Sequence, residues 1–72
     1  MSRSFYHYLM TLRGPQRDAV TTFANEAGKD IQFPKHTTEY EEVSDYLEMN
    51  VDYLDSMDIF DEAWEKYKEN SR

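Results

Sequence analysis

The 72-residue chain has no cysteine, two glycines and two prolines. Without cysteine it can form neither disulfides nor thiolate metal sites, and it has no cysteine nucleophile. Two separate glycines also leave it without a glycine-rich loop of the kind that cradles a phosphate. The length predicts a single domain, residues 1–72, with no room for both a cofactor-sized cleft and a full catalytic apparatus.

Long hydrophobic runs are missing as well. At most two strictly apolar residues follow one another, so we expect no segment that spans a membrane. The first residues lack the long apolar core and the small-residue cleavage site of a signal peptide. Together with the absence of disulfides, this pattern predicts a protein of the reducing cytoplasm.

Negative charge is abundant, and it is unevenly placed. Residues 1–37 hold five Lys or Arg against three Asp or Glu, a net charge of +2. Residues 38–72 hold three against twelve, a net charge of −9. Many of these acids fall at predicted helix starts, where the helix dipole favours negative charge by about 0.3–1 kcal/mol each. Helix starts thus explain much of the acidity, although the asymmetry also fits a basic partner.

The first helix is expected over Ser4–Arg13. Its first residue or Ser2 can cap it, and Gly14-Pro15 can end it, because glycine accepts a left-handed C-cap and proline cannot continue a helix. At helical spacing, one face carries Phe5, Tyr8, Leu9 and Leu12. A second face carries Tyr6 and Met10. A helix that is apolar almost all round is normally central, with contacts on both sides.

The second helix is expected to begin at Gln16 or Asp18 and to end at Gly28 as a C-cap. Small residues are frequent in its apolar stripe, which indicates close approach to a neighbouring helix. The stripe comprises Ala19, Val20, Phe23, Ala24 and Ala27.

Residues 30–36 are expected to form an irregular connector. Ile31 and Phe33 alternate with polar residues, but Pro34 and the short length argue against a sheet strand. We therefore expect both apolar side chains to enter the core from a loop.

The third helix has the clearest start signal. Thr38 and Glu41 fit a capping box, in which the threonine side chain bonds forward and the glutamate reaches back to the cap amide. Asn50 can end this helix, and residues 51–55 can add one short helical turn with Tyr53 and Leu54 inward. The inward stripe of the helix is Tyr40, Val43 and Leu47, with Tyr46 beside it.

The fourth helix is expected over Ser56–Glu69. Within it, Glu62 and Lys66 have the spacing and orientation of a favourable i,i+4 ion pair. Its amphipathic stripe comprises Ile59, Phe60, Ala63, Trp64 and Tyr67. The whole pattern predicts an all-α fold, a compact bundle of four to five short helices.

Four sequence blocks, in this order, resemble the YozE-like family, a group of short, uncharacterised proteins of Gram-positive bacteria. The blocks are SFYHYLM at 4–10, FPK at 33–35, SDYLE at 44–48 and IFDEAW at 59–64. The resemblance covers residues 4–67 and implies a helical bundle of the sterile-alpha-motif-like (SAM-like) type. It carries over no catalytic or binding residue, and a fold of this type does not decide between protein and nucleic-acid binding.

Residues that could carry chemistry form no recognisable motif. No local pattern places a serine on a strained turn beside His7 or His36. Asp52, Asp55 and Asp58 recur every three residues, whereas an EF-hand calcium loop needs alternate ligands, a central glycine and a distal glutamate. We therefore predict no enzyme activity and no catalytic, cofactor-binding or metal-binding residue.

Aromatic residues are the most prominent feature, with six tyrosines, four phenylalanines and one tryptophan. A few of them suffice for a small core, because each buries about 150–250 Å². Tyrosine also suits interfaces, since it combines an apolar ring with a polar end. The residues that we single out as a protein interface are Tyr6, Met10, Tyr46 and Tyr53.

A nucleic-acid-associated protein is the alternative. Its basic patch would come from the N-terminal half and would comprise Arg13, Arg17, Lys29 and Lys35. The acidic half, residues 38–72, would repel a phosphate backbone. We therefore favour a non-enzymatic cytoplasmic module that binds another protein, with the partner's identity and the oligomeric state left open.

Overall fold

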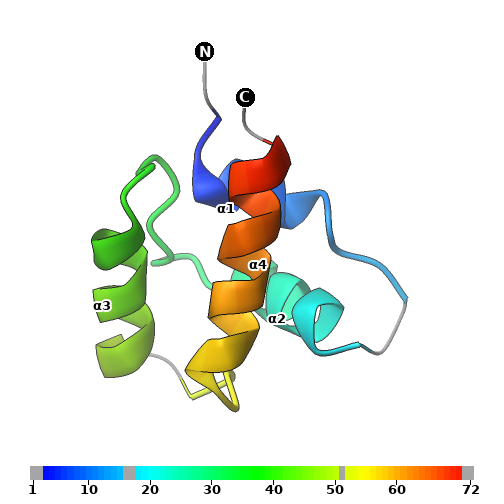
Figure 1. Cartoon of the computed structure of the whole chain (residues 1–72). Helices are drawn as coiled ribbons and strands as arrows, with labels where there is room; N and C mark the ends of the chain where they lie inside the picture. The colour runs from blue at the N-terminus through cyan, green and yellow to red at the C-terminus, as the bar shows by residue number, and fades with distance from the viewer. Residues whose placement is uncertain (1–2, 16–17, 51, 71–72) are drawn as a thin grey trace.

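The computed structural model describes residues 3–15, 18–50 and 52–70. Over these ranges the chain forms four α-helices and no strand: α1 (Phe5–Met10), α2 (Ala19–Lys29), α3 (Tyr40–Asn50) and α4 (Met57–Asn70). Helix α4 packs against each of the other three, and it runs between α3 and α2 with α1 behind its C-terminal half (Figure 1). The predicted all-α bundle is confirmed. Some residues named in the sequence predictions lie outside the described ranges: Ser2, Gln16, Arg17 and Val51.

Helix α1 begins where the sequence predicts and ends at Met10, three residues early. The Ser4 side chain caps it by accepting a hydrogen bond from the His7 backbone N–H at 3.1 Å. At the other end, the Thr11 hydroxyl donates to the Tyr8 carbonyl at 2.6 Å, and the backbone N–H of Thr11 donates to the same oxygen. These bonds tighten the last turn and end the helix before the glycine.

Neither glycine is the left-handed C-cap that the sequence predicted, since no described glycine has a positive φ. Gly14 follows α1, and its backbone N–H and carbonyl bond to the Asn25 side chain at 3.3 and 3.0 Å. Gly28 lies within α2, where a Cβ would come within 3.2 Å of Arg13 Cδ and 3.3 Å of Met10 Sδ. The missing side chain therefore lets α1 and the residues after it lie close against α2.

Helix α2 buries the predicted stripe apart from Ala19, the first residue of the helix, which is exposed. The connector, residues 30–39, links α2 to α3 without regular structure, as predicted. Phe33 enters the core from this connector, but Ile31 is 87 % exposed, so the prediction that both side chains are buried is wrong for Ile31. A turn closed by Phe33 N–H and the Asp30 carbonyl orients only one of the two side chains inward.

The described hydrogen bonds at the start of α3 come from Thr37 and Glu42 and are not those of the predicted capping box. The Thr37 side-chain oxygen accepts a hydrogen bond at 3.0 Å from Glu39 N–H, which precedes the first helical residue, Tyr40. The Thr37 hydroxyl also donates to the Glu42 carboxylate, the position after the predicted Glu41. Of the predicted inward positions, Val43 and Leu47 are buried but Tyr40 is 40 % exposed, and the helix ends at Asn50 as predicted.

The described residues between α3 and α4 form bends rather than the predicted extra helical turn. Tyr53 and Leu54 nevertheless pack against the core from this segment. Ser56 caps α4 from the position before its first residue, because its carbonyl accepts from Ile59 N–H and its hydroxyl accepts from Asp58 N–H, both at 3.1 Å.

Helix α4 carries the centre of the core. The predicted stripe is buried at Phe60, Ala63, Trp64 and Tyr67 and half-buried at Ile59. The predicted Glu62–Lys66 pair is wrong; in the described part of this helix the ion pair is Lys68–Glu65, at 3.4 Å. Four rings form what we call the core cluster, each no more than 7 % exposed: Phe5, Phe60, Trp64 and Tyr67.

Two further contacts close the bundle at the ends of the described chain. The Tyr67 hydroxyl donates to the Arg3 carbonyl at 2.6 Å, and Asn70 Nδ2 donates to the Tyr8 hydroxyl at 3.4 Å. These bonds join residues more than 60 positions apart in the sequence. They satisfy the polar ends of core tyrosines whose rings are buried.

Candidate functional site

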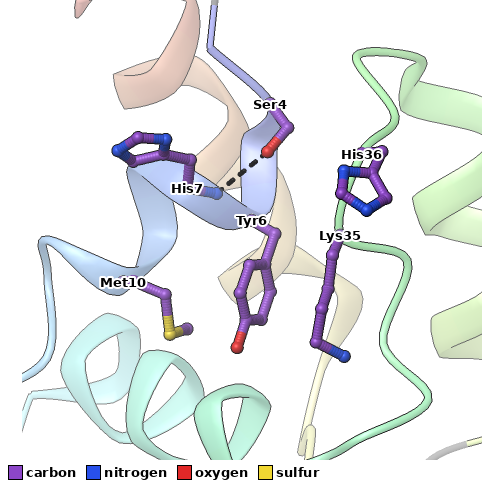
Figure 2. Close-up of a pocket in the computed structure, with 6 residues that line it drawn as sticks. All are labelled: Ser4, Tyr6, His7, Met10, Lys35 and His36. Carbon is purple, nitrogen blue, oxygen red and sulfur yellow. Dashed lines mark hydrogen bonds between the residues drawn. The ribbon is translucent and has the colours of Figure 1, made fainter.

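A groove of about 600 Å³ lies between α1 and the connector. Figure 2 shows α1 and the connector on opposite sides of it, with α2 below. Apolar and polar side chains line it together: Ser4, Tyr6, His7, Met10, Lys35 and His36. The groove therefore joins two predicted interface residues, Tyr6 and Met10, to one residue of the predicted basic patch, Lys35.

The Tyr6 side of the groove is fixed by aromatic rings that pack at an angle to one another. The Tyr6 ring centroid lies 5.5 Å from that of buried Phe33, and Phe33 lies 5.7 Å from Tyr46 on α3. Phe33 thus connects α1 to α3 through the connector, at ring separations typical of favourable aromatic pairs.

The Asp30 carboxylate holds the connector to the segments behind it. Tyr46 and Tyr53 both donate hydrogen bonds to its Oδ2 atom, the latter at 2.9 Å, and Gln32 N–H donates to Oδ1 at 3.0 Å. One carboxylate at the end of α2 therefore joins α3, the bend after α3 and the connector. We call the group of Tyr6, Asp30, Phe33, Tyr46 and Tyr53 the connector cluster.

These contacts shift the acid–base equilibria of the cluster. Burial, and then the hydrogen bond to Asp30, raises the pKa of Tyr46 to about 12. The same causes raise the pKa of Tyr53 well above its ordinary value. Burial acts to raise the pKa of Asp30, but the hydrogen bonds from both tyrosines and from Gln32 N–H, with the Lys35 charge, lower it overall. At neutral pH Asp30 is therefore a carboxylate, and the Tyr46 and Tyr53 side chains that bond to it are neutral phenols.

Lys35 bridges the connector and the groove. Its Nζ donates to the Ile31 carbonyl at 2.7 Å and to the Phe33 carbonyl at 3.3 Å, which fixes the turn of the connector. The same atom lies 5.3 Å from the centroid of the Tyr6 ring, within the range of a cation–π contact. An ammonium has three N–H donors, so one donor remains for a ligand.

The four residues predicted as an interface lie around one connector, on two sides of it. Tyr6 and Met10 line the groove and are half-buried. Tyr46 and Tyr53 lie behind it, where their hydroxyls bond to Asp30. Their polar ends thus serve the fold, and the groove is the surface that the first pair presents.

The residues of the predicted basic patch make separate local contacts. Arg13 Nε donates to the Met10 carbonyl at 3.2 Å, and Lys29 pairs with Glu26 at 3.4 Å. Lys35 donates to connector carbonyls. Arg17 lies outside the described residues.

Sequence reasoning did not identify the groove as a site or Asp30 as the acceptor for two tyrosines. One available signal was physical: a partly buried tyrosine hydroxyl needs a hydrogen-bond partner. The grouping of Ser4, His7 and His36 depends on how the connector folds back along α1, and no residue spacing encodes that.

Membrane and metal features can be checked only within the described ranges. There, no helix has both the length and the apolar character needed to cross a bilayer. In the same ranges, no group of three His, Asp or Glu side chains is placed to hold a metal ion.

Comparison with known proteins places the fold. A family model described as the YozE SAM-like fold matches residues 4–69. A UPF0346 protein of Enterococcus faecalis is 71 % identical over 72 residues, all of both chains. The UPF0346 protein YozE of Bacillus subtilis is 52 % identical over 67 residues, which are 92 % of this chain and 90 % of the relative.

A solved structure agrees with these matches. The solution NMR structure of the yozE protein from Bacillus subtilis superposes with a TM-score of 0.84 at 51 % identity, covering 94 % of this chain and 84 % of that one. These matches span nearly the whole length of the chain, and the chain belongs to the YozE SAM-like family.

Proposed function

We propose that this protein is a non-enzymatic cytoplasmic module that binds another protein through the groove between α1 and the connector. The observation that carries the proposal is the lining of the groove, where Tyr6 and Met10 are half-buried beside the cation of Lys35. Aromatic and methionine side chains are enriched at protein interfaces, because they offer large contact areas.

The contacts that hold Tyr6 and Lys35 in place support the same proposal. Phe33 fixes the Tyr6 ring, and two backbone carbonyls fix Lys35. A surface whose side chains are already ordered loses less conformational entropy when a partner binds. The groove would therefore reach useful affinity with a small contact area.

Electrostatics supports a protein partner over the alternative, a nucleic acid. The chain has a formal net charge of −7, the sum of −9 over residues 38–72 and +2 over residues 1–37. Arg13, Lys29 and Lys35 all make local contacts within the protein. A polyanion with one charge per about 1.7 Å of duplex would need a concentrated cationic face to offset that repulsion.

Site-specific photo-crosslinking in a Gram-positive host tests the proposal. A benzoylphenylalanine at position 36 replaces an exposed groove residue, and one at position 68 replaces an exposed lysine of α4 as the control. We expect a protein adduct at position 36 that resists nuclease and is absent at position 68. A nuclease-sensitive adduct would favour the nucleic-acid alternative, and equal adducts at both positions would contradict a specific groove.

A further inference from the structure

The floor of the groove is apolar and adaptable. Met10 Sδ lies next to Gly28 of α2, at a position only 3.3 Å from where a Cβ would be. Beside it the Tyr6 ring is held in place by Phe33. A flexible thioether next to a fixed ring can fit an aliphatic or aromatic side chain of varied shape.

The lining of the groove carries one cation, Lys35. The lining residues include Lys35, His7 and His36 but no Asp or Glu. Among the described residues, no carboxylate lies within 4.0 Å of Lys35 Nζ, whereas Lys29 and Lys68 each have a glutamate at 3.4 Å. Lys35 therefore carries a positioned positive charge without a direct ion pair in the described chain.

The nearest competing acid is occupied elsewhere. The Asp30 carboxylate interacts with the Lys35 charge at longer range, but its oxygens accept from Tyr46, Tyr53 and Gln32 N–H. A carboxylate from outside could therefore bond to the remaining N–H of Lys35 without displacing an existing ion pair.

The rest of the molecule restricts how acidic the occupant can be. Residues 38–72 carry a net charge of −9, and the lining supplies one permanent cation. A segment with a single carboxylate gains a charge-assisted hydrogen bond there. A densely acidic segment or a nucleic acid adds repulsion that one cation cannot offset.

From these observations we infer that the groove binds a short segment of another protein in which an apolar side chain stands next to a single carboxylate. The apolar side chain would lie on Met10 and Tyr6, and the carboxylate would accept from Lys35 Nζ. This inference rests on the proposed function and specifies the chemistry of the partner.

Selection from a random seven-residue peptide display library on the immobilised full chain tests the inference. We expect the enriched peptides to contain an aliphatic or aromatic residue next to one Asp or Glu. Amide shift mapping with a synthetic peptide of the enriched sequence should then locate it at Tyr6, Met10 and Lys35. Its affinity should fall about tenfold when the acid is replaced by the matching amide, the loss of one charge-assisted hydrogen bond.

Three variants separate the groove charge from folding. Lys35→Met keeps the aliphatic chain and should weaken peptide binding about tenfold. The matched control Lys29→Met, at an exposed position of α2, should leave the affinity unchanged. Because Lys35 also supports the connector, His36→Glu provides a second test at an exposed position and should weaken the peptide by charge repulsion.

The outcomes are distinguishable. Enriched peptides that map to the groove but lack a carboxylate overturn this inference and leave the proposed function standing. The same conclusion follows if the peptides bind the Lys35→Met and His36→Glu variants with the same affinity as the parent chain. Enriched peptides that all map elsewhere overturn both. If the purified chain self-associates and His36→Glu abolishes that self-association, the occupant is a second copy of the chain. If oligonucleotides bind tightly at Lys35, the occupant is a nucleic acid. Either result overturns the inference.

Discussion

The core cluster around α4 and the connector cluster beside α1 are both built from aromatic rings, but different forces hold them. In the core cluster, Phe5 lies 4.9 Å from Trp64 and 5.5 Å from Tyr67, and every ring is almost fully buried. In the connector cluster the rings are partly exposed except for Phe33, and one carboxylate, Asp30, binds two of the hydroxyls. Apolar burial dominates the first cluster, and polar bonds across a loop dominate the second.

That difference explains why the groove lies where it does. The core cluster uses its whole ring surface internally, so it leaves nothing for a partner. The connector cluster fixes the backbone through Asp30 and Phe33, while Tyr6 is half-buried and lines the groove. A groove whose backbone is held in place by such contacts is suited to recognising a partner.

The largest effect is expected from breaking the core cluster. Trp64→Ala should cost about 3–5 kcal/mol, because it removes the ring that contacts Phe5, Tyr40, Phe60 and Tyr67. A domain of this size has little more stability than that, so the folded state should be nearly lost. Thermal melting followed by circular dichroism measures this, and a cooperative melt close to that of the parent would refute the assignment.

A smaller loss is expected from breaking the connector cluster. Asp30→Asn removes the charged acceptor of two tyrosine hydroxyls and should lower the free energy of unfolding by about 1–3 kcal/mol. The exposed Asp45→Asn on α3 is the matched control and should change stability by less than about 0.5 kcal/mol. Urea titration decides the matter, and equal effects of the two variants would show that the carboxylate does not hold the connector.

The same cluster predicts a loss of stability at alkaline pH. Above the ordinary tyrosine pKa of 10.0, Tyr46 and Tyr53 lose their phenol protons in the unfolded chain. In the folded chain they retain these protons, because the pKa of Tyr46 is raised to about 12 and that of Tyr53 is raised as well. The free energy of unfolding should therefore fall as the pH rises from about 10 to 12. Urea titrations across that range should show a shallower fall for Asp30→Asn, and identical slopes would contradict the shared carboxylate.

The smallest effect concerns the start of α3. Thr37→Ala should cost about 0.5–1.5 kcal/mol, because it removes the hydrogen bonds from Glu39 N–H and to the Glu42 carboxylate that hold the connector at the start of α3. Thr38→Ala, at the neighbouring exposed position, should leave the melting midpoint nearly unchanged. The reverse order would restore the capping box that the sequence predicted.

The helices and the core were predictable because they follow from periodicity. Phe60, Ala63, Trp64 and Tyr67 are spaced so that one helical face carries them all, and that face is buried. The predicted helix boundaries were wrong where a side-chain hydrogen bond to a nearby backbone group is not visible in the hydrophobic periodicity. Thr11 ends α1 early, and Thr37 rather than Thr38 bonds to the backbone before α3.

The candidate site was only partly predictable for a related reason. Tyr6 and Met10 were identified from their place on the second face of an all-round apolar helix, and both line the groove. Their position beside Lys35 and His36 depends on the path of the connector. Asp30 fixes that path through its bonds to Tyr46 and Tyr53, which follow it by 16 and 23 positions in the sequence. A contact over that separation leaves no periodic signal in the sequence.

The central claim is that a protein partner occupies the groove, and two methionines allow a direct test. Met10 lines the groove, whereas Met49 is 82 % exposed on α3. Spectra of the full chain with ¹³C-labelled methionine methyl groups can be compared before and after adding nuclease-treated cytoplasm of a Gram-positive host. The account predicts that the Met10 signal shifts or broadens while the Met49 signal stays as it was. A change at Met49 with an unperturbed Met10 signal would contradict the account.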